Sequence, residues 1–551
     1  MQQATSAPGI LRRYLAAIRA HKARSATILA MATVLGATIV ACGGGGGGAG
    51  GSDSSGGQTT PPPPPPVNGP AWLNVGGDPQ HTATAAIATQ TLNRILWQTP
   101  LDTAPQYSPS GYLLIHYGSP AITAKNTVLL PVKRAAALQY RVEARAGATG
   151  TLVWSFDSDY VMPPHRWVPS YNVTLTRSNR VYAAGSGGKV YYRDNADSAS
   201  STTQTAVFYG AAVYTQSQAA LDASVFINTP ITADAAGNIY FGFIANPGNP
   251  ANLASGVARI GADGTTTWAG ATARSGDSTV TKAATNSAPA LSSDGKTLYV
   301  AVDGDSTGNT NNGYTGYLLA LDSSTLALKS KVALIDPVSA KPATVSDDGT
   351  ASPMVGPDGD VYLGVLETYV PDHNDRGWLM HFDATLSQTK TPGSFGWDDT
   401  PSVVPASMVS SYKGSSSYLL MVKYNNYGGA GSGDSKNRVA VLDPNATQND
   451  AISGNLVMKE VVSILGQTPD PDFPGGVTEW CINTAAVDPL THSIIVNNED
   501  GYMYRWDVST NTLSEKLRLT SGLGESYTPT AVGPDGAVYG INNGVLFAIG
   551  K

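Results

Sequence analysis

The chain has 551 residues, and 96 of them are glycine or proline. Hydrophobic residues make up 41 % and charged residues 14 %, which excludes a disordered chain and, with so many helix breakers, a helical bundle. Beyond residue 41 the chain carries 29 Lys and Arg against 41 Asp and Glu, so nucleic acid is excluded as an expected partner. The composition therefore predicts an all-β protein of many short strands.

The start of the chain predicts export. Five basic residues between Arg12 and Arg24 precede an apolar run of 16 residues, 26–41. A membrane-spanning helix needs about 20 apolar residues, whereas a secretory signal peptide joins a basic segment to a shorter apolar one. We interpret residues 1–41 as a signal peptide.

The end of this apolar run points to a lipid anchor. Ile39-Val40-Ala41-Cys42 resembles the lipobox of bacterial lipoproteins, which implies lipid attachment at Cys42 and cleavage before it. Gly43 stands where the inner-membrane retention signal of that family has Asp, which favours the outer membrane. An ordinary signal peptide followed by a chance cysteine is the alternative.

Residues 42–69 predict a disordered tether. Glycine and serine dominate residues 43–57, and six prolines follow at 61–66. A Gly/Ser-rich segment is a flexible coil and a proline run is a stiff spacer, so neither buries a core.

Cysteine content adds little. If Cys42 carries lipid, Cys481 is the other cysteine of the chain, so a disulfide framework and paired-cysteine zinc or haem sites are excluded. Cys481 lies between Trp480 and Ile482, which favours a buried small hydrophobe over a reactive thiol.

One pattern recurs along the rest of the chain. It consists of a small or polar residue beside proline or alanine, alternating apolar residues, a turn that usually contains glycine, and a second apolar run. Its eight copies begin at Gly118, Val168, Asn228, Ser287, Ala351, Thr400, Asn483 and Thr528. A third apolar run follows most copies, as at 316–322 and 501–507, and a fourth follows several, as at 152–157.

Eight four-stranded units predict a single eight-bladed β-propeller over residues 70–551. One such unit cannot bury both of its faces alone, whereas in a closed ring each unit packs against two neighbours. The last copy stops after three strands at Lys551, and residues 94–100 are placed to supply the fourth strand and close the ring. Seven blades are the alternative if the long sixth copy or the weak second copy is not a blade.

The repeat resembles a known family. The pattern P-x-V/I-x-x-D-G-x-V-Y-x-G, present at residues 353–364, is similar to the repeat of the PQQ-binding-like, quinoprotein-dehydrogenase-like β-propellers. Residues 72–82 (WLNVGGDPQHT) are similar to the entry segment of that superfamily. The resemblance implies the fold over residues 70–551. It leaves activity open, since the superfamily mixes quinone-dependent dehydrogenases with scaffolds such as the lipoprotein of the outer-membrane barrel-assembly machinery.

A propeller's ligand site is expected in the funnel at one end of its axis, at residues just before the innermost strands. There the chain has His116, Tyr117, His165, Arg166, Trp167, Tyr171, Asn228, Asn286, Asp398, Asp399, Glu479, Trp480, Asn483, Glu525 and Tyr527. Polar groups beside aromatic walls suit a small polar or planar ligand. The alternative is that these side chains plug the channel and satisfy one another.

The resemblance would allow a PQQ enzyme. Arg166, Asp398 and Glu479, with Trp480, could hold the quinone and calcium and act as base. In much of that family, however, the quinone stacks on a disulfide between neighbouring cysteines, and Cys481 has no neighbouring cysteine. PQQ and calcium are therefore not favoured as cofactors.

The sequence thus predicts an exported lipoprotein, anchored to the outer membrane, whose monomeric propeller binds an envelope protein or a small polar ligand. A quinone- or metal-dependent oxidoreductase that uses the funnel is the alternative function.

Overall fold

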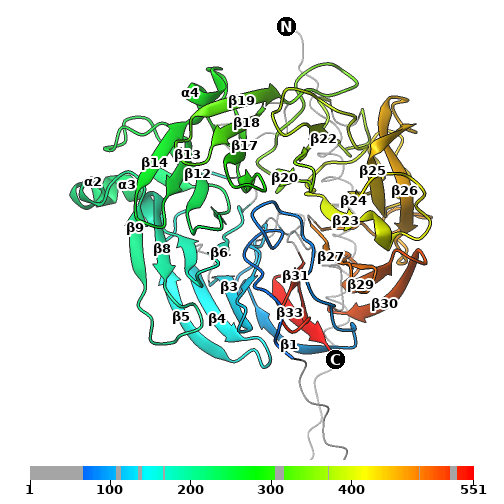
Figure 1. The fold of residues 1–551 in the computed structure, drawn as a ribbon, viewed down its shortest axis with the longest axis horizontal. Helices are drawn as coiled ribbons and strands as arrows, with labels where there is room; N and C mark the ends of the chain where they lie inside the picture. The colour runs from blue at the N-terminus through cyan, green and yellow to red at the C-terminus, as the bar shows by residue number, and fades with distance from the viewer. Residues whose placement is uncertain are drawn as a thin grey trace, which may run out of the picture.

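The protein is an eight-bladed β-propeller, almost entirely β, as predicted from the repeats (Figure 1). The computed structural model describes residues 66–106, 113, 115–134, 139–165, 168–304, 316–369, 372–482, 484–520 and 530–551. The predicted signal peptide, Cys42 and nearly all of the predicted tether lie outside these residues.

The first four blades follow one another along the chain. Blade 1 holds β2 (Ala121–Ile122), β3 (Thr127–Lys133), β4 (Tyr140–Ala146) and β5 (Leu152–Ser158). Blade 2 holds β6 (Val173–Leu175), β7 (Val181–Ala184), β8 (Lys189–Arg193) and β9 (Gln204–Val207). Blade 3 holds β10 (Val225–Ile227), β11 (Thr232–Ala233), β12 (Ile239–Ala245), β13 (Gly256–Ile260) and β14 (Thr266–Gly270). Blade 4 holds β15 (Lys282–Ala283), β16 (Ala290–Leu291), β17 (Thr297–Asp303), β18 (Tyr317–Asp322) and β19 (Leu328–Ala333).

The second four blades complete the ring. Blade 5 holds β20 (Met354–Val355), β21 (Val361–Val365) and β22 (Trp378–Phe382). Blade 6 holds β23 (Ser402–Pro405), β24 (Tyr418–Tyr424), β25 (Arg438–Asn449) and β26 (Leu456–Leu465). Blade 7 holds β27 (Ala486–Asp488), β28 (Ser493–Asn497), β29 (Tyr502–Asp507) and β30 (Thr512–Arg518). Blade 8 holds β31 (Ala531–Val532), β32 (Val538–Asn542), β33 (Val545–Gly550) and β1 (Arg94–Pro100).

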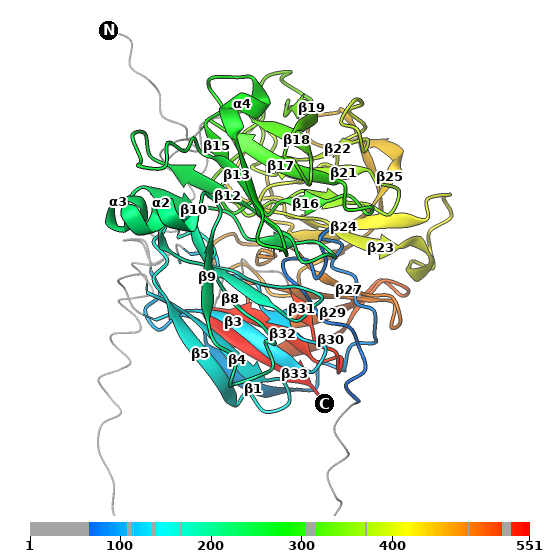
Figure 2. The same ribbon diagram turned by 60° about the vertical axis from the view of Figure 1, so that its left-hand side comes forward.

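The described helical segments are short. They are α2 (Ala211–Gln216), α3 (Gln218–Asp222) and α4 (Ala271–Ser275), with the 3-10 turns η1 (Ser186–Gly188) and η2 (Ala406–Met408). Figure 2 shows α2 and α3 projecting from the ring between blades 2 and 3. Within the described ranges, no helix has the length and hydropathy needed to cross a bilayer.

The core lies between neighbouring blades. Second strands are buried on both sides, as in β3 and β21, where every residue is buried. Outermost strands alternate instead: along β30, exposed and half-buried residues follow one another without a break. Each inner strand therefore packs against two neighbouring blades, and the outer strands meet water with one face.

The ring closes as predicted, through blade 8. β1 pairs antiparallel with β33, from Arg94 opposite Gly550 to Pro100 opposite Val545, with a bulge between Ile95 and Trp97. The strand before the first blade thus completes the last one, so the two parts of the chain hold each other.

The two ends of the propeller axis differ. Antiparallel pairing places the turns after the innermost strands, such as 123–126 and 356–360, at one end. The connections between blades, such as 208–224, 334–353 and 466–482, lie at the other. We call the end with these long connections the insertion face.

The opposite end is covered by residues 68–93, which we call the collar. Its backbone bonds to residues at the ends of innermost strands around the ring, starting and finishing at blade 8, with Gly69 N–H on Pro534 O (2.8 Å) and Gln90 N–H on Gly536 O (2.8 Å). Between these points the collar contacts Ile122, Leu175, Leu291, Val355, Val403 and Val487, which lie in blades 1, 2, 4, 5, 6 and 7. Figure 1 shows this blue segment near the centre of the ring.

Arg505 of blade 7 fastens the end of the collar. Its guanidinium donates to Thr89 Oγ1 (2.8 Å), to Gln90 O (2.5 Å) and to Ser493 Oγ (2.7 Å), and pairs with Glu515 (3.0 Å). The Arg505 side chain is 7 % exposed, so these charge-assisted hydrogen bonds are largely shielded from water.

We expect Arg505→Leu to destabilise the protein by about 3 kcal/mol or more, because removing one partner leaves buried acceptors and a carboxylate unpaired. The midpoint of urea unfolding measures this. Lys516→Leu on the exposed side of β30 is the matched control and should change the free energy of unfolding by less than about 0.5 kcal/mol. Equal effects of the two substitutions would contradict the role given to the collar.

Candidate functional site

A cluster of buried polar side chains occupies the axis at the insertion face. It contains His116 of blade 1, Asp348 and Thr350 before β20, Asp398 and Asp399 before β23, and Lys423 of β24. We call this group the axial cluster. Asp398 accepts hydrogen bonds from Thr350 N–H (2.7 Å) and Thr350 Oγ1 (2.5 Å), and the Lys423 ammonium lies 3.8 Å from its other oxygen.

The charges of this cluster are set by burial. Burial raises the pKa of Asp399 well above its usual value, against the opposing effect of Lys423. Burial also lowers the pKa of His116, although Asp398 acts to raise it, so the imidazole is neutral. The cluster thus contains three aspartates, Asp348, Asp398 and Asp399, and one lysine, Lys423.

Hydrogen bonds join the loops before the innermost strands from blade to blade. Asn172 Oδ1 accepts from Ser119 N–H (2.9 Å), Asn286 Oδ1 accepts from Ser170 N–H (2.9 Å), and Thr400 Oγ1 accepts from Ser352 N–H (2.9 Å). Ser119, Ser352 and Thr400 each precede a proline of the sequence repeat. The polar residue of the repeat thus bonds one blade to the next, a role that the pattern alone did not predict.

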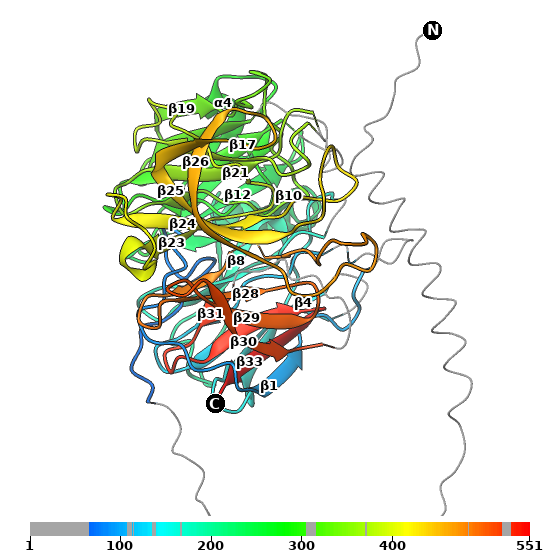
Figure 3. The ribbon, with the colours of Figure 1, turned by 90° about the vertical axis from the view of Figure 1, so that its right-hand side faces the viewer.

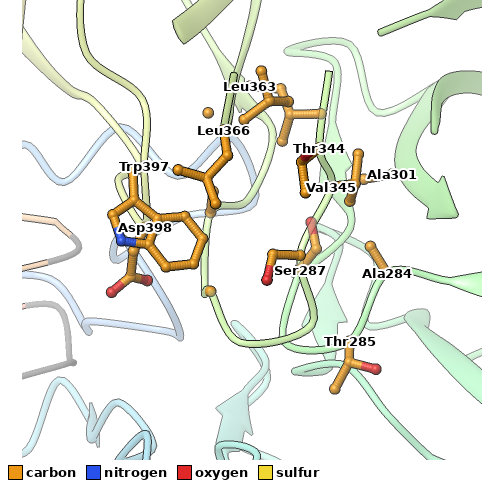
Figure 4. A pocket seen from close by; sticks show the side chains of 15 residues that line it. Ala284, Thr285, Ser287, Ala301, Thr344, Val345, Leu363, Leu366, Trp397 and Asp398 are labelled. Carbon is orange, nitrogen blue, oxygen red and sulfur yellow. The ribbon is translucent and has the colours of Figure 1, made fainter. Parts of the chain in front are cut away.

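A small cavity lies beside the axial cluster, between blades 4 and 5. Its volume of about 20 Å³ leaves room for one or two water molecules. Figure 4 shows Trp397 and Asp398 on one side of it and Ser287, Val345 and Ala301 on the other. Ser287 Oγ is buried and has no hydrogen-bond partner among the described residues, so an ordered water fits there.

The structure places the predicted funnel residues in different surroundings. Three axial candidates, His116, Asp398 and Asp399, come together, and Asn286 bonds across the loops to Asp347 O (3.3 Å). Asn228 is buried there too and donates to Ala283 O (2.8 Å). His165 is half-buried, and its Nδ1 faces Pro163 O at 2.7 Å.

Three aromatic candidates lie between blades instead of in the funnel. Trp480 is fully buried and donates from Nε1 to Asn437 O (3.3 Å) in the core of blades 6 and 7. Tyr171 packs on Tyr140, with ring centroids 4.5 Å apart, and Tyr117 lies 3.3 Å from Asp102. These residues lie in the connections before β2, β6 and β27, so no strand alternation sets the direction of their rings, and the sequence pattern could not predict it. Arg166, Trp167, Asn483, Glu525 and Tyr527 lie outside the described residues.

Glu479 belongs to a group that could hold a metal ion. One ligand atom each of Glu479, Cys481 and Glu499 lies within 4.8 Å of the others, and Glu499 also accepts from Glu479 N–H (2.9 Å). A thiolate with two carboxylates suits a divalent transition metal such as Zn²⁺. Cys481 is buried, as expected from its apolar neighbours.

A buried ion cluster near the cavity was missed at the sequence level. The Lys282 ammonium lies 2.6 Å from Asp303 Oδ1 and 2.8 Å from Asp347 Oδ1. Burial alone would lower the pKa of Lys282, but the two aspartates raise it above its usual value, so the charge is kept. The three residues are far apart in the chain, and no short motif connects them.

The described residues at this face do not fit PQQ with calcium. Lys423 stands beside Asp398, where a calcium ion would need an oxygen ligand without a neighbouring cation, and burial raises the pKa of Asp399, which disfavours the charged form that calcium binds. The cavity beside them has the size of a water or two rather than of a tricyclic quinone. Arg166, the residue expected to face the cofactor carboxylates, lies outside the described residues.

Comparison with solved structures identifies the fold. A europium-containing methanol dehydrogenase matches with a TM-score of 0.52 and 10 % identity, over 86 % of this chain and 89 % of that one. The fold is the quinoprotein-dehydrogenase-like β-propeller. BamB from Moraxella catarrhalis (13 % identity, TM-score 0.44, covering 83 % of this chain and 99 % of that one) also matches the propeller. So does the quinohemoprotein alcohol dehydrogenase from Comamonas testosteroni (11 %, TM-score 0.39, 86 % and 70 %).

At such low identity the first match shows the fold alone. No protein-family model matches the sequence, and no curated protein matches it. The resemblance seen in the repeat is thus confirmed as a resemblance of fold.

We expect Asp399→Asn to become more stable than the native protein as pH rises. Burial raises the pKa of the native carboxyl above its ordinary value of 3.8. The stability that this group contributes is therefore fully present below pH 3.8 and is lost as pH rises toward the pKa of the folded state. The difference in free energy of unfolding should grow from about pH 4 upward, by at most about 1.4 kcal/mol per pH unit, the limit for one proton. Urea unfolding at several pH values measures it.

Asp263→Asn is the control for this prediction. Hydrogen bonds from Thr265 lower the pKa of this exposed aspartate, so its substitution should show no gain at high pH. A pH-independent difference for Asp399→Asn would mean that Asp399 is ionised in the folded protein.

Proposed function

We propose that the protein is a cell-envelope lipoprotein whose propeller binds a partner through its insertion face. The observation that carries this proposal is the contrast between the two ends of the axis. The collar covers one end, and polar side chains fill the described part of the other, while the long connections between blades surround it. Loops on a rigid scaffold are a common place for recognition.

The filled axis favours binding over catalysis in the funnel. His116, Asp398 and Lys423 converge from blades 1 and 6, and Asp398 already accepts hydrogen bonds from Thr350 and faces Lys423. A small substrate would have to displace these contacts, whereas a protein partner can use the surrounding loops. The acidic balance of residues 42–551 suits a partner or ligand that is neutral or basic.

The lipid anchor can be tested directly. We expect cells fed a fatty acid that carries an alkyne tag to label the native chain, and Cys42→Ser to abolish the label and move the protein out of the membrane fraction. Cys481→Ser changes the other cysteine and should keep both the label and the membrane location. Label that persists in Cys42→Ser would contradict the anchor.

A metal-dependent oxidoreductase is the second candidate. It is favoured by the cluster of Glu479, Cys481 and Glu499, and the fold is shared with a structure named as a methanol dehydrogenase. Under this alternative the metal and a quinone would bind at the insertion face.

Thermal unfolding of residues 66–551 separates the two candidates. A ligand at one hundred times its dissociation constant adds about 2.7 kcal/mol of stability. We expect no shift of the melting temperature with PQQ plus calcium, because the described axis is already filled. A shift with PQQ and either calcium or zinc that is lost in Glu479→Gln would overturn the binding proposal in favour of the oxidoreductase.

A further inference from the structure

One side of the propeller, at blades 2 and 3, carries no charged side chain over three stretches of the sequence. Residues 198–221, 246–255 and 264–273 contain no Lys, Arg, Asp or Glu, whereas 14 % of the whole chain is charged. These stretches include β9, the α2–α3 segment and β14, which Figure 1 labels together at one side of the ring. We call the three stretches the neutral sector.

Hydrogen bonds join the three stretches into one continuous surface. Asn246 N–H donates to Ser224 O (2.8 Å), which ties the loop 246–255 to the end of the α2–α3 segment. Ala271 N–H donates to Ser255 O (2.9 Å), which ties the same loop to the end of β14. The lack of charge in the sequence is therefore a lack of charge on one part of the surface.

The neutral sector presents exposed apolar side chains on a fixed base. Val213 of α2 and Trp268 of β14 are each 36 % exposed. Phe208 and Leu221, on either side of α2 and α3, are buried in the core between the blades. The segment is thus held in place before any partner arrives, so binding costs little ordering of its backbone.

The sheet edges of this sector lack the charges found on the other edges. β9 and β14 are the outermost strands of blades 2 and 3, and neither contains a charged residue. The outermost strands β1, β5, β19, β26 and β30 each contain at least one; Figure 3 looks at the side of the ring that holds β26 and β30. Charge on an edge strand opposes pairing with another chain.

The outer edges of β9 and β14 are also open. Among the described residues, no strand or isolated bridge pairs with the outer edge of either strand. An unpaired edge presents a row of backbone N–H and C=O groups that a further strand can bind. The neutral sector therefore combines an open edge with exposed apolar side chains and no charge to prevent association.

The charge balance of the chain favours a second copy as the occupant of this surface. Beyond residue 41 the chain carries 29 basic against 41 acidic side chains, so two copies repel each other over most of their surfaces. That repulsion is smallest where neither copy presents a charge, and depletion of charged residues marks the core of protein interfaces. A charged partner would find no opposite charge to pair with in the neutral sector.

We propose that two copies of the chain pair through their neutral sectors, about a two-fold axis that sets β9 against β9 of the second copy. Such an axis makes an edge strand antiparallel to its copy, so the outer backbone groups of β9 gain partners. α2 lies next to β9, so its exposed side packs beside the new strand pair. The result is a dimer rather than the monomer expected from the sequence, and it does not depend on the partner proposed for the insertion face.

Sedimentation equilibrium of the purified full chain, in a buffer matched to the density of the detergent, tests the pairing. We expect the measured mass to rise from one chain to two as the concentration increases. Thr205→Lys puts an ammonium on the exposed edge of β9, opposite its own copy, and should weaken the dimer at least about tenfold. Ala212→Glu on the exposed side of α2 should weaken it as much, by repulsion between two carboxylates.

Thr512→Lys and Ala327→Glu are the matched controls. They make the same changes at exposed residues of blades 7 and 4, outside the neutral sector, and should leave the dissociation constant unchanged. All four residues are exposed, so the variants should fold, and thermal unfolding checks this. A mass of one chain at every concentration would overturn the proposal and leave the sector to a different partner. So would a dimer that resists either Thr205→Lys or Ala212→Glu, or that the controls weaken equally.

Discussion

The hydrogen bonds that close the ring are the constraint on which the rest of the structure depends. A blade buries its faces against two neighbours, so a ring with one open joint would expose two apolar faces at once. β1 fills that joint by pairing with β33, and the collar repeats the closure at the axis by bonding to blades all round the ring. The N-terminal segment is therefore part of the core architecture, and the buried guanidinium of Arg505 joins it to blade 7.

A closed ring in turn decides where charge can be buried. Eight innermost strands begin at one end of the axis, and the loops before them bring side chains from distant parts of the sequence together. Lys423 meets Asp398 there, and nearby Lys282 meets Asp303 and Asp347. Such pairs are costly to desolvate, and further hydrogen bonds hold two of the carboxylates: Asp398 accepts from Thr350, and Asp347 accepts from Thr285 N–H. The polar residues at the axis therefore have a structural role in joining the blades, before any role in binding a ligand.

The sequence predicted the repeated features and missed the single ones. Eight copies of one pattern give eight blades, and the three-stranded last copy predicted the role of residues 94–100. The collar, the long β25–β26 hairpin and the Lys282 cluster occur once each, so no repeat in the sequence predicts them. Trp480 shows a second reason: it lies in the connection between β26 and β27, where no periodic pattern predicts whether a side chain faces the axis or the next blade. His116 and Asp398 were predicted because their loops approach the axis whatever the register.

Blade 5 departs from the four-stranded pattern, and a neighbouring blade covers its outer edge. It has three named strands, and bridges from Leu379 to Gly393 and from Phe382 to Thr389 complete its outer edge. The distal part of the β25–β26 hairpin of blade 6 lies beside that edge, where Met458 N–H donates to Pro392 O. An open outer edge and its apolar residues need a cover, and a cover supplied by another blade can be attached by a few contacts. Those contacts include the carboxylate of Asp450, which faces His373 Nε2 and accepts from Ser394 Oγ, so the cover is held by polar groups as well as by apolar packing. Blade 6 therefore completes the propeller at the blade that has three named strands.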